Sequence, residues 1–291
     1  MKINRFQDNP LIEPDTNRDW MSVGVFNAGV IREKENGLFK MLFRATGHST
    51  TSFSSLGLAF SVNGVKWYVV DKPVLRCGYN DLCSRGIEDP RIVKFLDSYY
   101  IFATACSGAG GRIGIWRTQN FFEYEWIGSP LDWEDKDAAV VPEIIDGWVY
   151  LLHRRYPNIW LSRTKDPTLK SGWQDHRILL EPEPNEDKIG IAGPPVKTEF
   201  GWLVVIHAKT KYGNYHLRFI TLENSLALKY VHPQPILSPE KNYELVGNVN
   251  RVVFSCATVD VGDSYYIYWG GGDRCMAGGR LFKQDLEANT R

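Results

Sequence analysis

The stretch RGIEDPRIVKF, residues 85–95, places two adjacent carboxylates and an arginine at a turn that opens an apolar run. Glu88, Asp89 and Arg91 surround a proline there. Turn residues commonly precede strands, but several charges at such a point are costly unless they are paired or have a chemical task. The turn is therefore either an ordinary one, in which Asp89 pairs with Arg91, or one that holds an acid in place to donate a proton.

The remaining candidate residues are mostly cationic, which restricts the chemistry. Glycoside cleavage usually needs two carboxylates, one to protonate the leaving oxygen and one to activate water or attack carbon. Asp89 is a candidate for the acid, but Arg, Lys and His predominate at the other candidate positions. A phosphate nucleophile already carries charge, so it needs cations to hold it rather than a base to deprotonate it. One acid with a set of cations is what an inverting phosphorylase requires.

Several common catalytic motifs are missing from the sequence. The six histidines show no HExxH or other metal-ligand spacing, so we expect neither a metal site nor an organic cofactor. There is no GxSxG motif, and CSGAGGRIG lacks the glycine spacing of a dinucleotide fingerprint. Ten tryptophans and 14 tyrosines provide flat faces that suit sugar rings, although aromatic residues also fill β cores.

The overall composition argues against several classes of partner. There are 34 basic and 34 acidic residues, so the net charge is zero and no basic surface for nucleic acid is expected. The sequence has no apolar run of about 18 residues, so we expect no membrane-spanning helix. The first residues lack the apolar region of a secretory signal. Five cysteines without CxxC spacing favour reduced thiols and a cytoplasmic location. The sequence marks no interface, and a homo-oligomer is compatible with it.

Five related hairpins organise the chain. In each, an apolar run, a polar turn and an aromatic-rich run follow one another, and the aromatic midpoints lie roughly 50–65 residues apart, the range of propeller repeats. Weaker hairpins lie between them, which makes four strands per repeat; five such blades close a ring without long exposed edges. We find no amphipathic helix of three turns and no linker. The sequence predicts an all-β fold, a five-bladed β-propeller formed by residues 1–291 as a single domain. The aromatic midpoints are Phe39, Tyr100, Trp148, Trp202 and Tyr266.

This architecture directs attention to the first hairpin of each repeat, because the innermost strand of a blade lines the central channel. Polar residues recur there in phase, which solvated outer strands would not do. Arg154 and Arg155 are adjacent on a strand and point to opposite faces, so only one reaches the channel, and we choose Arg154. The polar residues on the first strands are Asn27, Asp89, Asp137, Glu143, Lys188 and Asn250, and those ending the second strands are Arg44, His153, Arg154, His207 and Asp273.

Seven segments in the same order resemble glycoside hydrolase family 130. The resemblance extends from about Asn9 to Asp273 and implies a five-bladed propeller that phosphorolyses, or in some branches hydrolyses, β-mannosides. The segments are VFNAGVI, EDPRI, KDAAVVPE, LLHRRYPNIWLS, KIGIAGPPVKTEFGWLVVIH, PILSPEKNYELVG and NVNRVVFSCATV.

The resemblance also implies roles for individual residues. The aspartate of EDPR, here Asp89, is the general acid, and it protonates the glycosidic oxygen through the substrate's own 3-hydroxyl. Family members that use phosphate hold it with cations, whereas those that hydrolyse tend to lose the cations and offer glutamates. The matching phosphate-binding positions are Arg112, Arg154, Lys188 and His207, and the substrate-binding positions are Asn27, Arg44 and Asp273. Apart from the resemblance, Glu143 is a candidate for a second carboxylate in the substrate pocket.

The sequence is interpreted as an inverting β-mannoside phosphorylase that acts on a β-mannoside oligosaccharide with inorganic phosphate as co-substrate and without a cofactor. The product would be α-mannose 1-phosphate and a shortened glycan. One alternative is an inverting β-mannosidase, in which water replaces phosphate and Glu143 acts as base. Another is a sugar-binding propeller without turnover. The linkage, β-1,4 or β-1,2, and the acceptor sugar are not indicated by the sequence.

Overall fold

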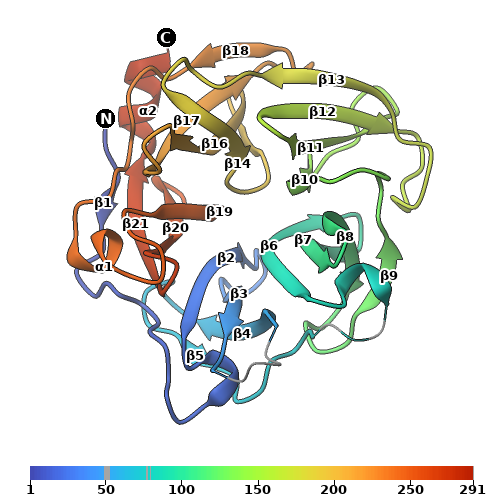
Figure 1. Ribbon diagram of the computed structural model, residues 1–291. Helices are drawn as coiled ribbons and strands as arrows, with labels where there is room; N and C mark the ends of the chain where they lie inside the picture. Colours follow the sequence, from blue (N-terminus) through green and yellow to red (C-terminus); the bar gives the residue numbers. More distant parts are fainter. Residues whose placement is uncertain (49–52, 77, 79, 291) are drawn as a thin grey trace.

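Five β-sheets surround a central axis in the computed structural model, which describes residues 1–48, 53–76, 78 and 80–290 (Figure 1). Each sheet is antiparallel and forms one blade, so the predicted five-bladed β-propeller is confirmed. Short loops connect successive strands within a blade, as the closely spaced hairpins of the sequence require. The innermost strands gather at the centre of the ring in Figure 1, and they are β2, β6, β10, β14 and β19.

The blades follow the chain in order, and each begins at the axis. The first contains β2 (Gly24–Arg32), β3 (Phe39–Thr46), β4 (Ser55–Ser61) and β5 (Tyr68–Val69). The second contains β6 (Gly86–Phe95), β7 (Ser98–Ser107), β8 (Gly110–Thr118) and β9 (Glu125–Gly128). The third contains β10 (Lys136–Val140), β11 (Val149–Arg155), β12 (Asn158–Thr164) and β13 (Gln174–Leu180).

The last two blades depart from the simple repeat. The fourth contains β14 (Glu186–Ile191), β16 (Gly201–Thr210), β17 (Tyr215–Leu222) and β18 (Leu228–Val231), and the short β15 (Val196–Thr198) also pairs with β16. The fifth contains β19 (Val253–Asp260), β20 (Ser264–Gly271) and β21 (Cys275–Phe282), and its outermost strand is β1 (Asn4–Arg5). The sequence predicted two consecutive hairpins in every repeat, so this closure of the ring by the N-terminal segment is a difference.

Helices are few and short in the part of the chain that the structure describes. They are η1 (Asp19–Met21), η2 (Asp81–Cys83), α1 (Asn242–Leu245) and α2 (Lys283–Thr290). The prediction of no amphipathic helix of three turns is therefore confirmed for these residues. None of the helices in the described residues is long and apolar enough to cross a membrane.

The apolar cores lie between neighbouring blades rather than inside any one sheet. Leu42 of the first blade and Ile101 of the second are completely buried in one cluster. Phe43 and Tyr268 belong to a second cluster, between the first blade and the fifth. Each blade therefore stabilises its neighbours by burying apolar surface against them, and the inner strands are held close together around the axis.

The inner strands share an irregularity at the same end. In each, the pairing with the second strand of the blade shifts register, as in a β-bulge, after the first few residues. In the first three blades, the extra segment contains an Asn or Asp with positive φ: Asn27 at 51°, Asp89 at 53° and Asp137 at 50°. Asn and Asp tolerate this conformation better than other non-glycine residues. The shifts lie between Phe26 and Gly29, Glu88 and Arg91, Lys136 and Ala139, Glu186 and Lys188, and Ser255 and Ala257.

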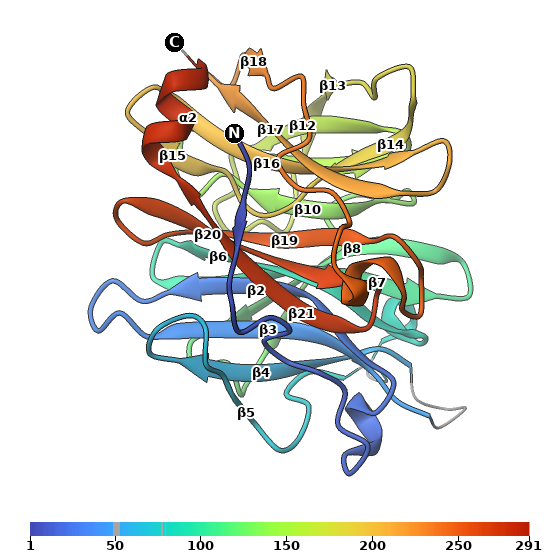
Figure 2. The same cartoon turned by 90° about the vertical axis from the view of Figure 1, so that its left-hand side faces the viewer.

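An ion pair secures the closure of the ring. β1 lies along β21 (Figure 2), and Arg5 donates from Nε and Nη2 to the two carboxylate oxygens of Glu244 at 2.9 and 2.8 Å. Glu244 is completely buried and also accepts a hydrogen bond from Trp269 Nε1 at 3.2 Å. The bidentate contact therefore fastens the N-terminal strand to the fifth blade.

We expect Arg5→Ala to lower the free energy of unfolding by about 3 kcal/mol, because the Glu244 carboxylate would remain buried without its cationic partner. Urea unfolding of the variant measures the loss. The matched control is Lys2→Ala, an exposed position on the same segment. Equal, small losses in the two variants would show that the ion pair contributes nothing to ring closure.

Candidate active site

The acid predicted at the turn is held between the first two blades. Asp89 lies in the register shift of β6, and its Oδ1 accepts hydrogen bonds from Asn27 Nδ2 at 2.9 Å and from Arg44 Nη1 at 3.3 Å. Arg44 also donates to Glu88 Oε1 at 2.7 Å. Arg91 instead donates to the main-chain oxygen of Asp89, at 2.8 Å. The turn is therefore not an ordinary side-chain pair of Asp89 with Arg91.

A second acid faces this corner from the fifth blade. Asp273 lies between β20 and β21 with a positive φ of 49°. Burial raises its pKa to about 6, and the nearby negative charge of Asp89 acts in the same direction, while Arg44 opposes both. Asn27, Arg44, Asp89 and Asp273 are thus brought to one place from three blades.

Arg91 connects the acid corner to the opposite side of the axis. Its side chain is 1% exposed and donates to the main-chain oxygens of Ile191 at 2.9 Å and Ala192 at 3.1 Å. Its Nη2 also lies 3.2 Å from Asp137 Oδ1. The guanidinium therefore joins the second blade to the third and fourth.

Asp137 is the centre of a second buried cluster. Its carboxylate is completely inaccessible and lies 3.0 Å from Arg154 Nε and 3.1 Å from His207 Nε2. Burial alone would raise the pKa of Asp137, but Arg154, Arg91 and His207 together hold it well below its usual range. Asp137 is therefore an anion in the interior of the protein; Arg91 and Arg154 balance its charge, and His207 lies within hydrogen-bond distance of it.

The ionisation of Asp137 determines the tautomer of His207. Burial lowers the pKa of His207, although Asp137 opposes the shift, so the imidazole is neutral near pH 7. A carboxylate only accepts hydrogen bonds, so Nε2 must carry the proton and donate to Asp137. The other ring nitrogen, Nδ1, is buried and has no hydrogen-bond partner among the described residues. His207 contacts Asp137, and neither ring nitrogen faces open solvent.

A hollow of about 380 Å³ opens beside this cluster, between the third and fourth blades. Burial lowers the pKa of Lys188 in its wall, the positive charges of Arg154 and Lys209 act in the same direction, and the result is a pKa of about 8. Cations that repel one another around a hollow are stabilised when an anion occupies it. The hollow is lined by Glu134, Asp135, Lys136, Arg154, Arg155, Tyr156 and Lys188.

The alternation of side chains along β11 agrees with the prediction for its two arginines. Arg154 is buried against Asp137, whereas Arg155 is exposed and stacks over Trp133, with its Cζ 5.0 Å from the ring centroid. Arg154 thus lies between the buried cluster and the hollow.

The structure places Glu143 apart from the other predicted site residues. Arg112 lies on β8, half-buried and opposite Ala105 of β7, and it follows Gly111, whose main-chain oxygen accepts from the main-chain nitrogen of Asp135 in the wall of the hollow at 3.1 Å. Glu143 lies in the turn after β10, beyond the end of the strand opposite to Asp137. Five residues lie between Asp137 and Glu143, and β10 carries the first three of them away from Asp137, about 10 Å of extended chain at roughly 3.3 Å per residue. Asp89, Arg154 and Lys188 share one end of the propeller, and Glu143 is not brought to them.

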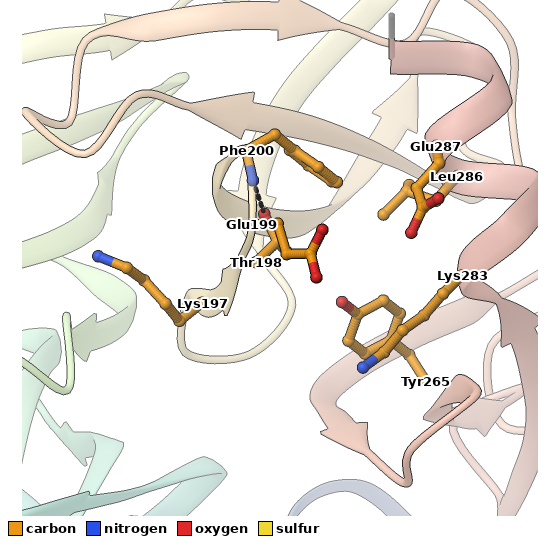
Figure 3. A pocket seen from close by; sticks show the side chains of 8 residues that line it. All are labelled: Lys197, Thr198, Glu199, Phe200, Tyr265, Lys283, Leu286 and Glu287. Atoms are coloured by element: carbon orange, nitrogen blue, oxygen red, sulfur yellow. Dashed lines mark hydrogen bonds between the residues drawn. The ribbon is translucent and has the colours of Figure 1, made fainter.

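Glu143 belongs instead to the far end of the ring, where a second hollow lies. It pairs with Lys197 of β15 at 3.3 Å, and both side chains are about half exposed. Lys197 contributes to the wall of a hollow of about 310 Å³, on whose other side α2 lies (Figure 3). Lys197 and Glu199 in this wall are exposed, in contrast to the buried charges around Asp137. We therefore place the candidate active site at the Asp89 end.

Two central residues received no role from the sequence. Arg91 was noted only as part of its turn, and Asp137 only as one polar residue among several. A signal for Asp137 does exist, because KDAAVV, FNAGVI and EDPRIV each set an Asn or Asp before a β-branched apolar pair. These are the three segments in which the structure has a positive-φ residue within the bulge.

Fold and site together define a carbohydrate-active propeller with one acid corner and one cationic hollow. The chain belongs to glycoside hydrolase family 130, whose model matches residues 4–286 and is described as beta-1,4-mannooligosaccharide phosphorylase. The resemblance seen in the sequence is therefore confirmed.

Relatives with curated names cover nearly the whole chain. A 1,2-beta-oligomannan phosphorylase of Thermoanaerobacter sp. (strain X514) is 36% identical over 303 residues, covering 99% of each chain. A beta-1,2-mannobiose phosphorylase of the same strain is 35% identical, covering 94% of each. Among solved structures, the complex of the Listeria innocua beta-1,2-mannobiose phosphorylase with beta-1,2-mannobiose has a TM-score of 0.90 at 27% identity, covering 100% of this chain and 99% of the other.

We expect Asp273→Asn to stabilise the protein above pH 6 and not below about pH 4. Because the folded-state pKa of Asp273 is raised from 3.8 to about 6, its ionisation removes stability as the pH rises through this window, on the order of 2 kcal/mol. The asparagine has no charge to bury. Thermal unfolding of both proteins at pH 4 and pH 7 measures the effect, and equal melting temperatures at pH 7 would contradict it.

Proposed function

We propose that the protein is an inverting β-mannoside phosphorylase. Phosphate oxygen forms a bond to the anomeric carbon of a non-reducing mannosyl unit, and the bond from that carbon to the glycosidic oxygen breaks. The products are α-mannose 1-phosphate and a glycan shortened by one unit. The observation that carries this proposal is the group of mutually repelling cations, Lys188 and Arg154 above all, in the wall of a hollow on the same end as Asp89.

The acid corner around Asp89 supplies the proton for the leaving oxygen, and the cationic hollow binds the phosphate. Asp89 donates the proton that the leaving oxygen takes up, by way of the substrate's 3-hydroxyl, as the family resemblance implies. Asn27, Arg44 and Asp273 surround Asp89 and hold the mannosyl unit. Arg154 and Lys188 bind the phosphate and balance its charge, with Arg112 at the edge of the neighbouring blade. The chemistry requires no metal or organic cofactor, because phosphate itself is the nucleophile.

We further propose that the linkage cleaved is β-1,2. The relatives that are 35–36% identical over nearly their full length are named for β-1,2-linked oligomannan or mannobiose, and a structure with a TM-score of 0.90 holds β-1,2-mannobiose. The family description names the β-1,4 linkage instead, so both linkages belong in the test.

We also infer a cytoplasmic location, which the free thiols of Cys83, Cys106, Cys256 and Cys275 support.

Hydrolysis is less well supported on this scaffold. An inverting hydrolase needs a carboxylate base on the face of the sugar opposite to the acid. Glu143, the base considered for that reaction, pairs with Lys197 at the far end of the ring. The side of the site that faces away from Asp89 offers Arg154 and Lys188, which suit phosphate better than they suit a water-activating role.

The protein should release mannose 1-phosphate from β-1,2-mannobiose only when phosphate is present, and more slowly or not at all from β-1,4-mannobiose. Asp89→Asn should reduce the rate at least about a thousandfold, because the amide cannot donate the proton that the carboxylic acid provides. Product is measured by ion-exchange chromatography. Binding of mannobiose to the variant, measured by calorimetry, is the control for folding. Free mannose released equally with and without phosphate would identify a hydrolase.

Phosphate use should decline as the pH rises through about 8. Lys188 has a pKa of about 8 in the empty site, so it carries its charge below this pH and loses it above. The value of kcat/KM for phosphate should fall along this limb. Lys188→Arg should move the limb to higher pH, because a guanidinium stays protonated. Lys197→Arg, at the far end of the ring, is the matched control; an unshifted limb in Lys188→Arg would exclude Lys188 as its origin.

A further inference from the structure

We propose that Asp137 is a positioning residue that orients Arg154 toward the hollow and ties the phosphate side of the site to the peptide that carries the acid. It acts through other side chains and does not touch substrate. The proposal rests on the proposed function, in which phosphate lies against Arg154 and Lys188.

The contact between Asp137 and Arg154 leaves the two terminal nitrogens of the guanidinium available for another anion. Asp137 Oδ2 forms an ion pair with Arg154, 3.0 Å from its Nε. This contact fixes the plane of the guanidinium, while the terminal nitrogens remain for a second anion, and forked binding of phosphate needs them. Arg154 is largely buried against Asp137 and also lines the hollow, so one arginine faces a fixed anion on one side and the proposed phosphate on the other.

His207 also holds the Asp137 carboxylate in place. Its Nε2 proton is committed to Asp137 Oδ2, 3.1 Å away, and the ring stacks against Phe254 with centroids 4.0 Å apart. The remaining nitrogen carries no proton, so it has no hydrogen to offer to a phosphate oxygen. His207 therefore contributes to phosphate binding by holding the Asp137 carboxylate in place. Its role in this proposal is indirect, whereas the sequence predicted a direct contact.

The surrounding backbone leaves just enough room for the Asp137 carboxylate and its contact with His207. Asp137 occupies the bulge of β10 with a positive φ. A Cβ at Gly190 would lie 2.5 Å from Asp137 Oδ2 and 2.6 Å from His207 Nε2. A side chain on the fourth blade would thus displace the pair, and the glycine leaves room for it.

Arg91 extends the connection to the acid. It reaches Asp137 Oδ1 at 3.2 Å and the Asp89 main-chain oxygen at 2.8 Å. The two bulges that carry Asp89 and Asp137 are therefore linked through one buried guanidinium. A change in the charge of Asp137 would alter the placement of Arg154 directly and that of the Asp89 peptide through Arg91.

Asp137→Asn tests the proposal, because it keeps the shape and removes the charge. The amide has one acceptor oxygen where the carboxylate has two, so it cannot face Arg91 on one side and Arg154 with His207 on the other with an acceptor, and the negative charge that attracts both guanidinium groups is lost. Arg154 should therefore be held less firmly toward the hollow. We expect kcat/KM for phosphate to fall about a hundredfold or more, while the affinity for mannobiose, measured by calorimetry, changes less than about threefold. Long-range ¹H–¹⁵N spectra should show the proton of His207 on Nε2 in the wild type, as donation to Asp137 requires.

Glu33→Gln is the matched control for a buried carboxylate. Glu33 is 7% exposed and binds Lys40 and Tyr99 between the first two blades, at the far end of β2 and β6. It should lose stability without any change in phosphate kinetics. Arg154→Lys is the second functional variant, because lysine keeps the charge but has no fork with which to serve two anions. It should raise the KM for phosphate, and combining it with Asp137→Asn should cost little more than either change alone.

The outcomes separate this inference from the proposed function. A wild-type protein that makes no mannose 1-phosphate overturns the proposed function, and with it the role of Asp137 toward phosphate. A wild type that phosphorolyses, together with an equally active Asp137→Asn, overturns the inference alone. Equal losses of phosphate use and mannobiose affinity in Asp137→Asn would mean a merely structural role, which also overturns it. Should Asp137→Asn fail to fold, Arg154→Lys with an unchanged phosphate KM would still contradict the proposal.

Discussion

Groups from three blades converge on the carboxylate of Asp137, which solvent does not reach. A charge so deep in a protein is tolerated only when its partners are close and well oriented, and loss of one partner leaves the others uncompensated. The innermost strands can approach one another at the axis because Arg91 and Arg154 balance this anion and His207 donates a hydrogen bond to it. The form of the pocket follows from that balance, since the same arginines that neutralise Asp137 also face the acid corner and the cationic hollow.

The repeated bulge explains how one architecture provides two different chemistries. An extra residue in the inner strand re-aims a side chain toward the axis, and an Asn or Asp accepts the positive φ that the bulge imposes in three blades. In the second blade, this side chain is Asp89, whose polar and cationic neighbours Asn27 and Arg44 fix its orientation, as the proposed proton donation requires. In the third blade, the same position is Asp137, enclosed completely and used to place cations. Equivalent backbone positions thus acquire different tasks from their surroundings.

Like charges repel one another on both sides of the candidate site. Glu88, Asp89 and Asp273 lie around the single guanidinium of Arg44, and the raised pKa of Asp273 reflects both its burial and the charge of Asp89. On the other side, the pKa of Lys188 is lowered by burial and by other cations. Like charges gathered on each side of a pocket destabilise the folded protein, and an anion bound beside Lys188 would relieve the repulsion among the cations.

The sequence by itself determined the propeller, because alternating apolar residues and the period of the aromatic hairpins are local properties that do not depend on distant contacts. It also indicated which ends of the strands carry Asn27, Asp89, Arg154 and Lys188. Only the tertiary structure decided that the two-residue β1 closes the ring, since so short a strand has no pattern of its own. Likewise, the turn after β10 carries Glu143 away from Asp89, and three blades must meet before Asp137 becomes a buried centre. Such contacts join residues far apart in the chain, so their distances follow from the closed ring and not from local spacing.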